Sequence, residues 1–325
     1  MDIKVLKTFE LTDEDWVRIE GGFNRSFERT TTKEQLIRLY TSTVWGYSYH
    51  AVGYEQDEII GFTSIMPFQY LHKNQEFKAG LSCSSFVLKE YRKDIFIFQD
   101  MYEALKKECL KHGYTVFLGV PNENSHKYSI VLLGSKNVDN LPYYALPSKW
   151  LTVLKKDKYT FINVISAFCV RSFCCINMIF SYIFNFKEKP SEYRLLITDA
   201  FLKKRFSAPC YSCSTKKNIQ FRYRIVDEKG IQTAYLMDFR EHNKKTNKAL
   251  CTAVRHILRE EKIDIILYIG TLHMKQGLLL KVPSKFVPKP LPLTFNMLDV
   301  EKKERFATMS NIDLWDFSLI NFDGR

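Results

Sequence analysis

Two stretches of the sequence decide the expected fold: SSFVLKEYRKDIF at residues 84–96 and YTVFLGVPNENSHKY at residues 114–128. In each, an apolar run typical of a buried strand passes directly into a polar turn that opens a helix. Apolar residues recur at helical spacing over Lys93–His112, and Gly113 is well placed to end that helix. We expect the two polar loops to lie side by side, at the sheet edge where open α/β sheets hold ligands.

The same order of elements returns about 150 residues further along the chain, as a repeat at domain scale would require. The strands at 82–88 and 114–120 and the helix at 93–112 match strands at 233–239 and 263–269 and a helix at 243–261. Because strand–helix–strand order is common, chance is the alternative to a true repeat. The pattern predicts an α/β fold with mixed (α+β) sheets.

The length of 325 residues fits two domains better than one. We place the first domain at 1–157, an apolar connecting helix at 158–190 and the second domain at 191–325. A short helix is predicted over Leu272–Leu280, and late strands over Leu291–Leu298 and Leu314–Phe322.

The charge of the chain indicates an anionic partner. Lys plus Arg number 48 and Asp plus Glu 36, so the formal charge is 48 − 36 = +12. A hydrophobic fraction of 46% and a charged fraction of 26% exclude disordered, collagen-like and coiled-coil classes. The basic residues lack the interleaving with aromatics that a nucleic-acid track would show, so we expect no nucleic acid. Small polyanions come first as partners, and an acidic membrane second.

The cysteines and the N-terminus indicate a cytoplasmic protein. The first residues, MDIKVLKTFELTDEDW, lack the apolar core of a signal peptide, and a reducing compartment would keep the eight cysteines as thiols. Cys210 and Cys213 form a lone CxxC without the second ligand pair of a structural zinc site, so we expect no metal.

One apolar segment, 161–186, raises a membrane question. Asn163, Arg171 and Asn177 interrupt it, which argues against a spanning helix. Two interpretations stay open: a helix buried between domains or in a homodimer contact, and a helix in the plane of a membrane that would make the protein membrane-associated.

The loop after the first strand suits a pyrophosphate. A helix N-terminus carries unpaired N–H groups and a partial positive charge, and Arg92 and Lys93 lie where they would add cationic donors. A charged surface turn is the plain alternative.

These motifs, YR-x-x-I-F at 91–96 and PN-x-NS at 121–125 before a helix that ends at Gly134, resemble the GNAT acyltransferase superfamily. The resemblance covers about 45–147 and is closest to the two-domain sugar N-acyltransferases. It implies two tandem GNAT-like domains, the second degenerate. It also implies acyl-CoA as co-substrate and the amine of a nucleotide-linked amino sugar, for surface polysaccharide synthesis, as acceptor.

The resemblance assigns roles position by position. A splayed strand that pairs with pantetheine would be Phe86, Val87 and Leu88, and the pyrophosphate loop would be Arg92, Lys93, Asp94, Ile95 and Phe96. Contacts to the pantetheine arm would come from Asn122, Asn124 and Ser125. The family loop is rich in glycine, whereas this loop has none, and Asp94 would instead cap the helix.

Acyl transfer to an amine also needs a base and an acid. His126 is the candidate base, with Glu123 acting through a water as another. The family's acid position holds Ile130, so Tyr128 is the substitute acid, although it points to a different helix face. Cys83 is read as a packing residue. Two other functions remain open: a Fem-type aminoacyltransferase that uses charged tRNA, and a non-catalytic binding protein.

Overall fold

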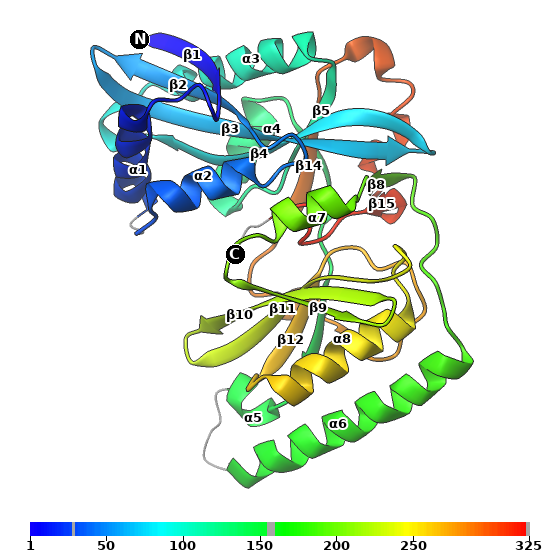
Figure 1. The fold of residues 1–325 in the computed structure, drawn as a ribbon. Helices are drawn as coiled ribbons and strands as arrows, with labels where there is room; N and C mark the ends of the chain where they lie inside the picture. Colours follow the sequence, from blue (N-terminus) through cyan, green and yellow to red (C-terminus); the bar gives the residue numbers. More distant parts are fainter. Residues whose placement is uncertain (28–29, 155–159, 323–325) are drawn as a thin grey trace. The chain divides into compact units, whose positions relative to one another are not determined.

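The computed structural model describes residues 1–27, 30–154 and 160–322. They form two compact units, each of which is built from segments that are separated in the sequence (Figure 1). The first unit comprises Met1–Asn140, Glu192–Ser207 and Leu291–Leu314, and the second comprises Leu141–Ser191, Ala208–Pro290 and the residues from Trp315 on. The domain boundaries predicted from the sequence lie once before and once after the apolar helix. The units are discontinuous because strands from distant segments pair with each other, and local sequence patterns do not show such pairing.

The first unit is built on a mixed sheet. Its strands lie in the order β1 (Asp2–Lys7), β2 (Tyr49–Glu55), β3 (Glu58–His72), β4 (Gln75–Val87), β5 (Tyr114–Gly119), β14 (Pro292–Met297) and β6 (Lys136–Asn140). Neighbours along this path are antiparallel except β4 and β5, which are parallel. β8 (Tyr193–Leu195) pairs with the far end of β3.

Helices cover both faces of this sheet. α3 (Phe96–Lys111) places Ile97, Met101 and Leu105 against buried residues of β2, β3 and β5. α1 (Asp13–Phe27) and α2 (Lys33–Thr41) cover the other face, where Trp16 and Tyr40 stack on each other and contact the ring of His50. α4 (Glu123–Val131) follows β5, and α7 (Asp199–Arg205) completes the helices described in this unit. One-turn helices lie at Lys89–Tyr91, Val300–Lys302, Ala307–Ser310 and Ile312–Leu314.

The second unit repeats the strand–helix–strand order. Its sheet runs β13 (Leu280–Lys281), β7 (Tyr143–Pro147), β12 (Ile265–Ile269), β11 (Ile231–Glu241), β10 (Ile219–Glu228) and β9 (Tyr211–Lys216). β11 and β12 are parallel and are joined through α8 (Asn247–Glu260), as β4 and β5 are joined through α3. The predicted repeat of elements is therefore confirmed. α5 (Trp150–Val153), α6 (Thr160–Ile183), a one-turn helix at Ser284–Phe286 and β15 (Trp315–Asp316) complete this unit.

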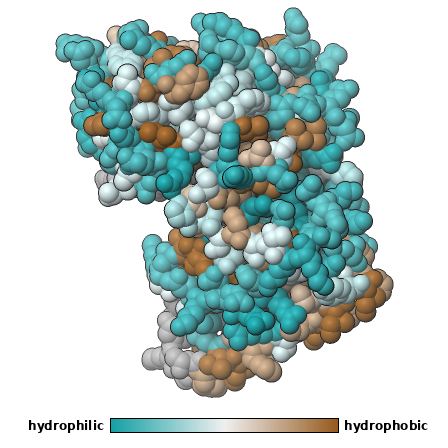
Figure 2. Space-filling model, in the orientation of Figure 1, coloured by the Kyte–Doolittle hydropathy of each residue, from teal (hydrophilic) through white to brown (hydrophobic). Residues whose placement is uncertain are grey.

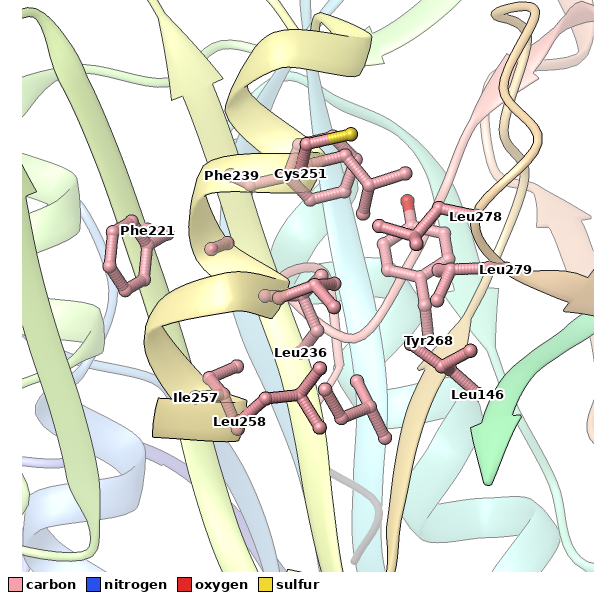
Figure 3. Packing of buried hydrophobic residues seen from close by; sticks show 14 of the residues in the cluster. Leu146, Phe221, Leu236, Phe239, Cys251, Ile257, Leu258, Tyr268, Leu278 and Leu279 are labelled. Atoms are coloured by element: carbon pink, nitrogen blue, oxygen red, sulfur yellow. The ribbon is translucent and has the colours of Figure 1, made fainter. Parts of the chain in front are cut away.

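The core of the second unit lies between α8 and its sheet. Figure 3 shows Ile257 and Leu258 of α8 near Leu236 of β11, and Leu146 of β7 beside Tyr268 of β12, all in one cluster. α8 buries eight residues against the sheet and α6, and they include the apolar residues from whose helical spacing the helix was predicted.

Two local predictions were wrong. Residues 272–280 form no helix, because the Gln276 side chain accepts the N–H groups of Leu278 and Leu279 at 2.8 Å each and bends the chain there. Of the late strand at 314–322, only Trp315–Asp316 is a strand. A third expectation stays partly open: only 22% of the most apolar window of α6 lies inside the protein, so the helix is not buried within this chain, whereas a homodimer contact and a membrane remain as the two possible surroundings.

Candidate functional site

The candidate site lies in the first unit, where β4 and β5 part. Their parallel pairing runs from Lys78 and Tyr114 to Ser82 and Gly119, and β4 then continues to Val87, still paired with β3 but no longer with β5. Ser84, with φ of 49°, lies where the register of β4 against β3 shifts. Such a bulge twists a strand away from its neighbour, so the edge of β4 past Ser82 is open toward β5.

The open edge of β4 offers backbone hydrogen-bonding groups. The Leu88 N–H donates to the Ile60 carbonyl of β3 at 2.9 Å. Because backbone groups of successive strand residues alternate in direction, the carbonyl of Val87 faces the open edge instead. Arg92 Nε donates to that carbonyl at 2.8 Å. An extended ligand with amide groups could pair with this edge as an added strand.

The loop from Arg92 to Phe96 leads from β4 into α3. The side chains of Arg92 and Lys93 are exposed, and so are Ile95 and Phe96. The Asp94 carboxylate accepts the Phe96 N–H at 2.9 Å, so it satisfies one of the donors at the start of α3. The loop therefore offers an anion two cationic side chains and a helix N-terminus at which one N–H group is already bonded to Asp94.

α4 begins at the end of β5, beside this edge. Asn122 caps it, since its side chain accepts the Ser125 N–H at 2.9 Å, and the Ser125 hydroxyl lies 3.0 Å from the same oxygen. Asn122, Asn124 and Ser125 are exposed. The parallel strands thus bring the two predicted loops to one sheet edge, as expected from the sequence.

The candidate base and acid do not share one face of α4. His126 and Tyr128 are two residues apart, hence about 200° apart around a helix. The Nε2 atom of His126 is buried without a hydrogen-bond partner among the described residues, whereas Glu123 and Tyr128 are exposed. Ile130 is half-buried.

A polar run at the bulge was not recognised in the sequence. Ser82, Cys83, Ser84 and Ser85 are all half-buried where β4 leaves β5, and Ser85 Oγ lies 2.7 Å from Thr63 Oγ1. Burial raises the pKa of the Cys83 thiol to about 12, so it is protonated at neutral pH and is a poor nucleophile. Three serines and a cysteine inside an otherwise apolar strand were the available signal.

Beneath the bulge lies a buried histidine. His50 Nδ1 is 2.8 Å from Ser64 Oγ, and its Nε2 is 2.9 Å from Thr8 Oγ1. Burial lowers the pKa of His50 to about 3, so the ring is neutral in the folded protein.

In the second unit, the corresponding loop lies between β11 and α8, and its Lys245 forms ion pairs with two carboxylates. Lys245 is buried and pairs with Asp316 and, at 3.7 Å, with Glu188, while its Nζ lies 3.1 Å from Tyr268 Oη. Burial would lower the pKa of Lys245, but the two carboxylates raise it well above its usual value. Burial raises the pKa of Glu188, whereas Lys245 and Arg240 outweigh burial and lower that of Asp316. Lys245 of this loop is therefore buried in ion pairs, whereas Arg92 and Lys93 of the first unit are exposed.

Metal ligands and disulfides are not features of the described structure. Within residues 1–27, 30–154 and 160–322, no group of three His, Cys, Asp or Glu could hold an ion. All eight cysteines lie in these ranges as free thiols, and Cys210 and Cys213 are exposed.

Comparison with known proteins gives the fold its context. No protein-family model and no curated protein matches the chain. A GCN5-related N-acetyltransferase from Anabaena variabilis has a TM-score of 0.56 and 9% identity, over 92% of this chain and 74% of that one. A probable N-acyltransferase of unknown function from Enterococcus faecalis has a TM-score of 0.54 and 9% identity, over 93% and 74%. Eis1 from Mycobacterium abscessus has a TM-score of 0.54 and 13% identity, over 95% and 75%. The chain therefore has the fold of the GCN5-related N-acetyltransferases.

Proposed function

We propose that the protein is an acyl-CoA-dependent N-acyltransferase. The observation that carries this function is the parting of β4 from β5 after Ser82 and Gly119, with a helix N-terminus following each strand. The open edge of β4 would pair with the amides of a pantetheine arm, and the loop from Arg92 to Phe96 would receive the pyrophosphate.

The residues at the open edge of β4 and at the start of α4 suit acyl-CoA. The loop before α3 suits it less well. The Val87 carbonyl faces the edge that the arm would occupy, although Arg92 must release it first. Asn122, Asn124 and Ser125 offer exposed polar groups at the adjacent helix start. The loop lacks glycine and Asp94 uses the Phe96 N–H, so Arg92 and Lys93 would supply most of the attraction to phosphate.

The chemistry requires a neutral amine, a polarised thioester carbonyl and a proton for the departing thiolate. Glu123 is exposed and would take the amine proton through a water. His126 is the alternative base, but its Nε2 is buried, so its ring would have to turn toward the acceptor. Tyr128 is exposed and would give the thiolate its proton.

We propose a nucleotide-linked amino sugar, used for surface polysaccharide, as the acceptor. The net charge of +12 supports an acceptor that carries phosphates, as CoA does. We also propose a cytoplasmic location, which the free thiols of the eight cysteines support.

Calorimetric titration with acetyl-CoA and longer acyl-CoAs tests the proposal. Val87→Pro removes the backbone N–H of a residue whose polar groups face the open edge, and Val87→Ile is the matched control. Binding to the wild type and the Ile variant, and loss of binding in a Pro variant that unfolds at the same temperature, would support pairing along β4.

Three outcomes would contradict the proposal or its details. If no acyl-CoA binds to the wild type, the proposed function is wrong. Retention of charged tRNA on a filter would favour the Fem-type aminoacyltransferase. Binding of acyl-CoA without transfer to any amine would favour a non-catalytic protein.

A further inference from the structure

The helix α6 of the second unit packs several of its polar side chains against the protein and exposes many of its apolar ones. Its polar side chains face the protein: Asn163 Oδ1 accepts the Leu151 N–H at 3.0 Å, and Ser166 Oγ donates to the Ser148 carbonyl at 2.9 Å. Arg171 donates to the Leu258 carbonyl at the end of α8, at 3.1 Å. These bonds fix the rotation of α6 on its own unit.

The opposite face of α6 is apolar and exposed. Nine of its large side chains are each more than half exposed, and six of them form the stripe discussed here: Val164, Ile165, Phe168, Ile176, Ile179 and Ile183. Consecutive members are one, three, eight, three and four residues apart, so they lie within about 120° of one another around the helix and form one stripe. Figure 2 shows hydrophobic side chains gathered along the lower edge of the view, where Figure 1 places α6. A stripe this long marks an interaction surface.

A cationic pocket adjoins the helix. Arg171, Arg255 and Arg259 line it together with Cys174, Cys175 and Leu258, and its volume is about 200 Å³. Arg255 and Arg259 are exposed, and Glu260 is the acidic residue paired with Arg259, at 3.5 Å. Guanidinium groups grouped in this way suit a phosphate.

In the sequence, lysines and exposed aromatic residues flank the helix. The segment from Lys155 to Lys189 contains six basic residues and two acidic ones, Asp157 and Glu188, and Glu188 is half-buried against Lys245. Trp150, 55% exposed, precedes the helix, and Tyr182, 65% exposed, lies in its last turn. Trp and Tyr favour the membrane–water interface, and lysines near a membrane surface favour anionic lipid.

We propose that α6 lies in the plane of an anionic phospholipid membrane, with its apolar stripe among the acyl chains and a lipid phosphate in the Arg171–Arg255–Arg259 pocket. Charge selects this partner over a second copy of the chain, since a homodimer would bring the same arginines and lysines together. The helix has the length and hydropathy of a membrane span. Its polar face, however, is bonded to residues 148–152 and to α8, so face-on docking keeps every one of these bonds.

Vesicle sedimentation of the full chain tests the proposal. We expect the protein to sediment with phosphatidylcholine vesicles that contain phosphatidylglycerol and to bind pure phosphatidylcholine about a hundredfold more weakly, because three arginines contact the surface. Phe168→Glu with Ile179→Glu puts two charges on the stripe and should abolish sedimentation. Phe9→Glu, at a residue of the first unit that is 69% exposed, is the matched control and should sediment as the wild type does.

The arginine pocket needs its own variant. Arg255→Gln with Arg259→Gln should weaken binding to the anionic vesicles and leave the weak binding to neutral vesicles unchanged. The proposal is overturned if the wild type stays in the supernatant, if it binds both kinds of vesicle equally, or if the stripe variant still sediments. A dimer in light scattering that the stripe variant converts to a monomer would assign the stripe to a second copy instead.

Discussion

The carboxylate of Asp94 accepts a hydrogen bond from the backbone N–H of Phe96 at 2.9 Å, at the first turn of α3. In the proposed function this carboxylate occupies a donor that the pyrophosphate of CoA would use, and it repels the phosphate charge. The protein thus has a more stable α3 at the cost of anion binding at the same turn.

Asp94→Ala should therefore change two quantities in opposite directions. We expect acetyl-CoA to bind severalfold more tightly in calorimetry, while the free energy of unfolding in urea falls by about 1 kcal/mol. Asp94→Asn, which keeps an acceptor and removes the charge, should keep the stability and gain part of the affinity. Weaker binding in both variants would mean that Asp94 helps to hold the ligand.

His50 should make the stability depend on pH. Its pKa is about 3 in the folded protein because it is buried, and about 6.5 in the unfolded chain. Since the unfolded state takes up the proton first, the stability is present above pH 6.5 and is lost as the pH falls toward 3. The loss should reach about 2 kcal/mol at pH 5.

The check compares urea unfolding at pH 7 and pH 5 for the wild type and for His50→Gln. The Gln amide can bond to Ser64 and Thr8 as the imidazole does, but it does not titrate. Between pH 7 and pH 5, the free energy of unfolding of the wild type should fall by about 2 kcal/mol more than that of His50→Gln. Equal dependence would show that other groups cause it.

The pair of Lys245 and Asp316 should be essential to the second unit. Lys245→Met leaves the half-buried carboxylates of Asp316 and Glu188 without the buried lysine that pairs with both, and breaking such a pair costs about 3–5 kcal/mol. We expect the free energy of unfolding to fall by that amount. Lys248→Met, which breaks the pair with Glu241 at a partly exposed lysine, is the control and should cost about 1 kcal/mol or less. A similar loss in both would refute the special role of the cluster.

Gly270 should not tolerate a side chain. Its φ is 137°, and a Cβ there would lie 2.4 Å from the carbonyl oxygen of Phe317 and from Ser318. Gly270→Ala should destabilise the protein by about 3 kcal/mol, since it adds a backbone clash to the strain. Gly113→Ala, at φ of 77° with open space around the new methyl, should cost about 1 kcal/mol. Thermal unfolding of both variants measures the difference.

Local sequence patterns were enough for most elements of the fold. The apolar runs that became β5 and β12 and the helical spacing in α3 and α8 gave the repeated unit, and Gly113 and Gly134 have the positive φ expected of helix ends. Asp94 was also expected to cap α3, and its carboxylate accepts the Phe96 N–H at the start of that helix.

The remaining features depend on contacts between distant segments. Residues 291–298 were expected as a strand, but only tertiary structure shows that β14 pairs with β5 and β6. The polar run at Ser82–Ser85 matters because β4 leaves β5 there, which the strand itself does not reveal. The exposed stripe of α6 is as apolar as a core helix, so composition alone could not assign its surroundings.

The place of β14 in the first sheet has a consequence for biosynthesis. β5 and β6 flank a gap that is filled only by Pro292–Met297, about 150 residues later in the chain. A nascent chain on the ribosome must therefore hold an unpaired edge of β5 throughout translation of the second unit. Such an edge recruits other strands, which makes β5 the expected site of chaperone contact or of misassembly in truncated products.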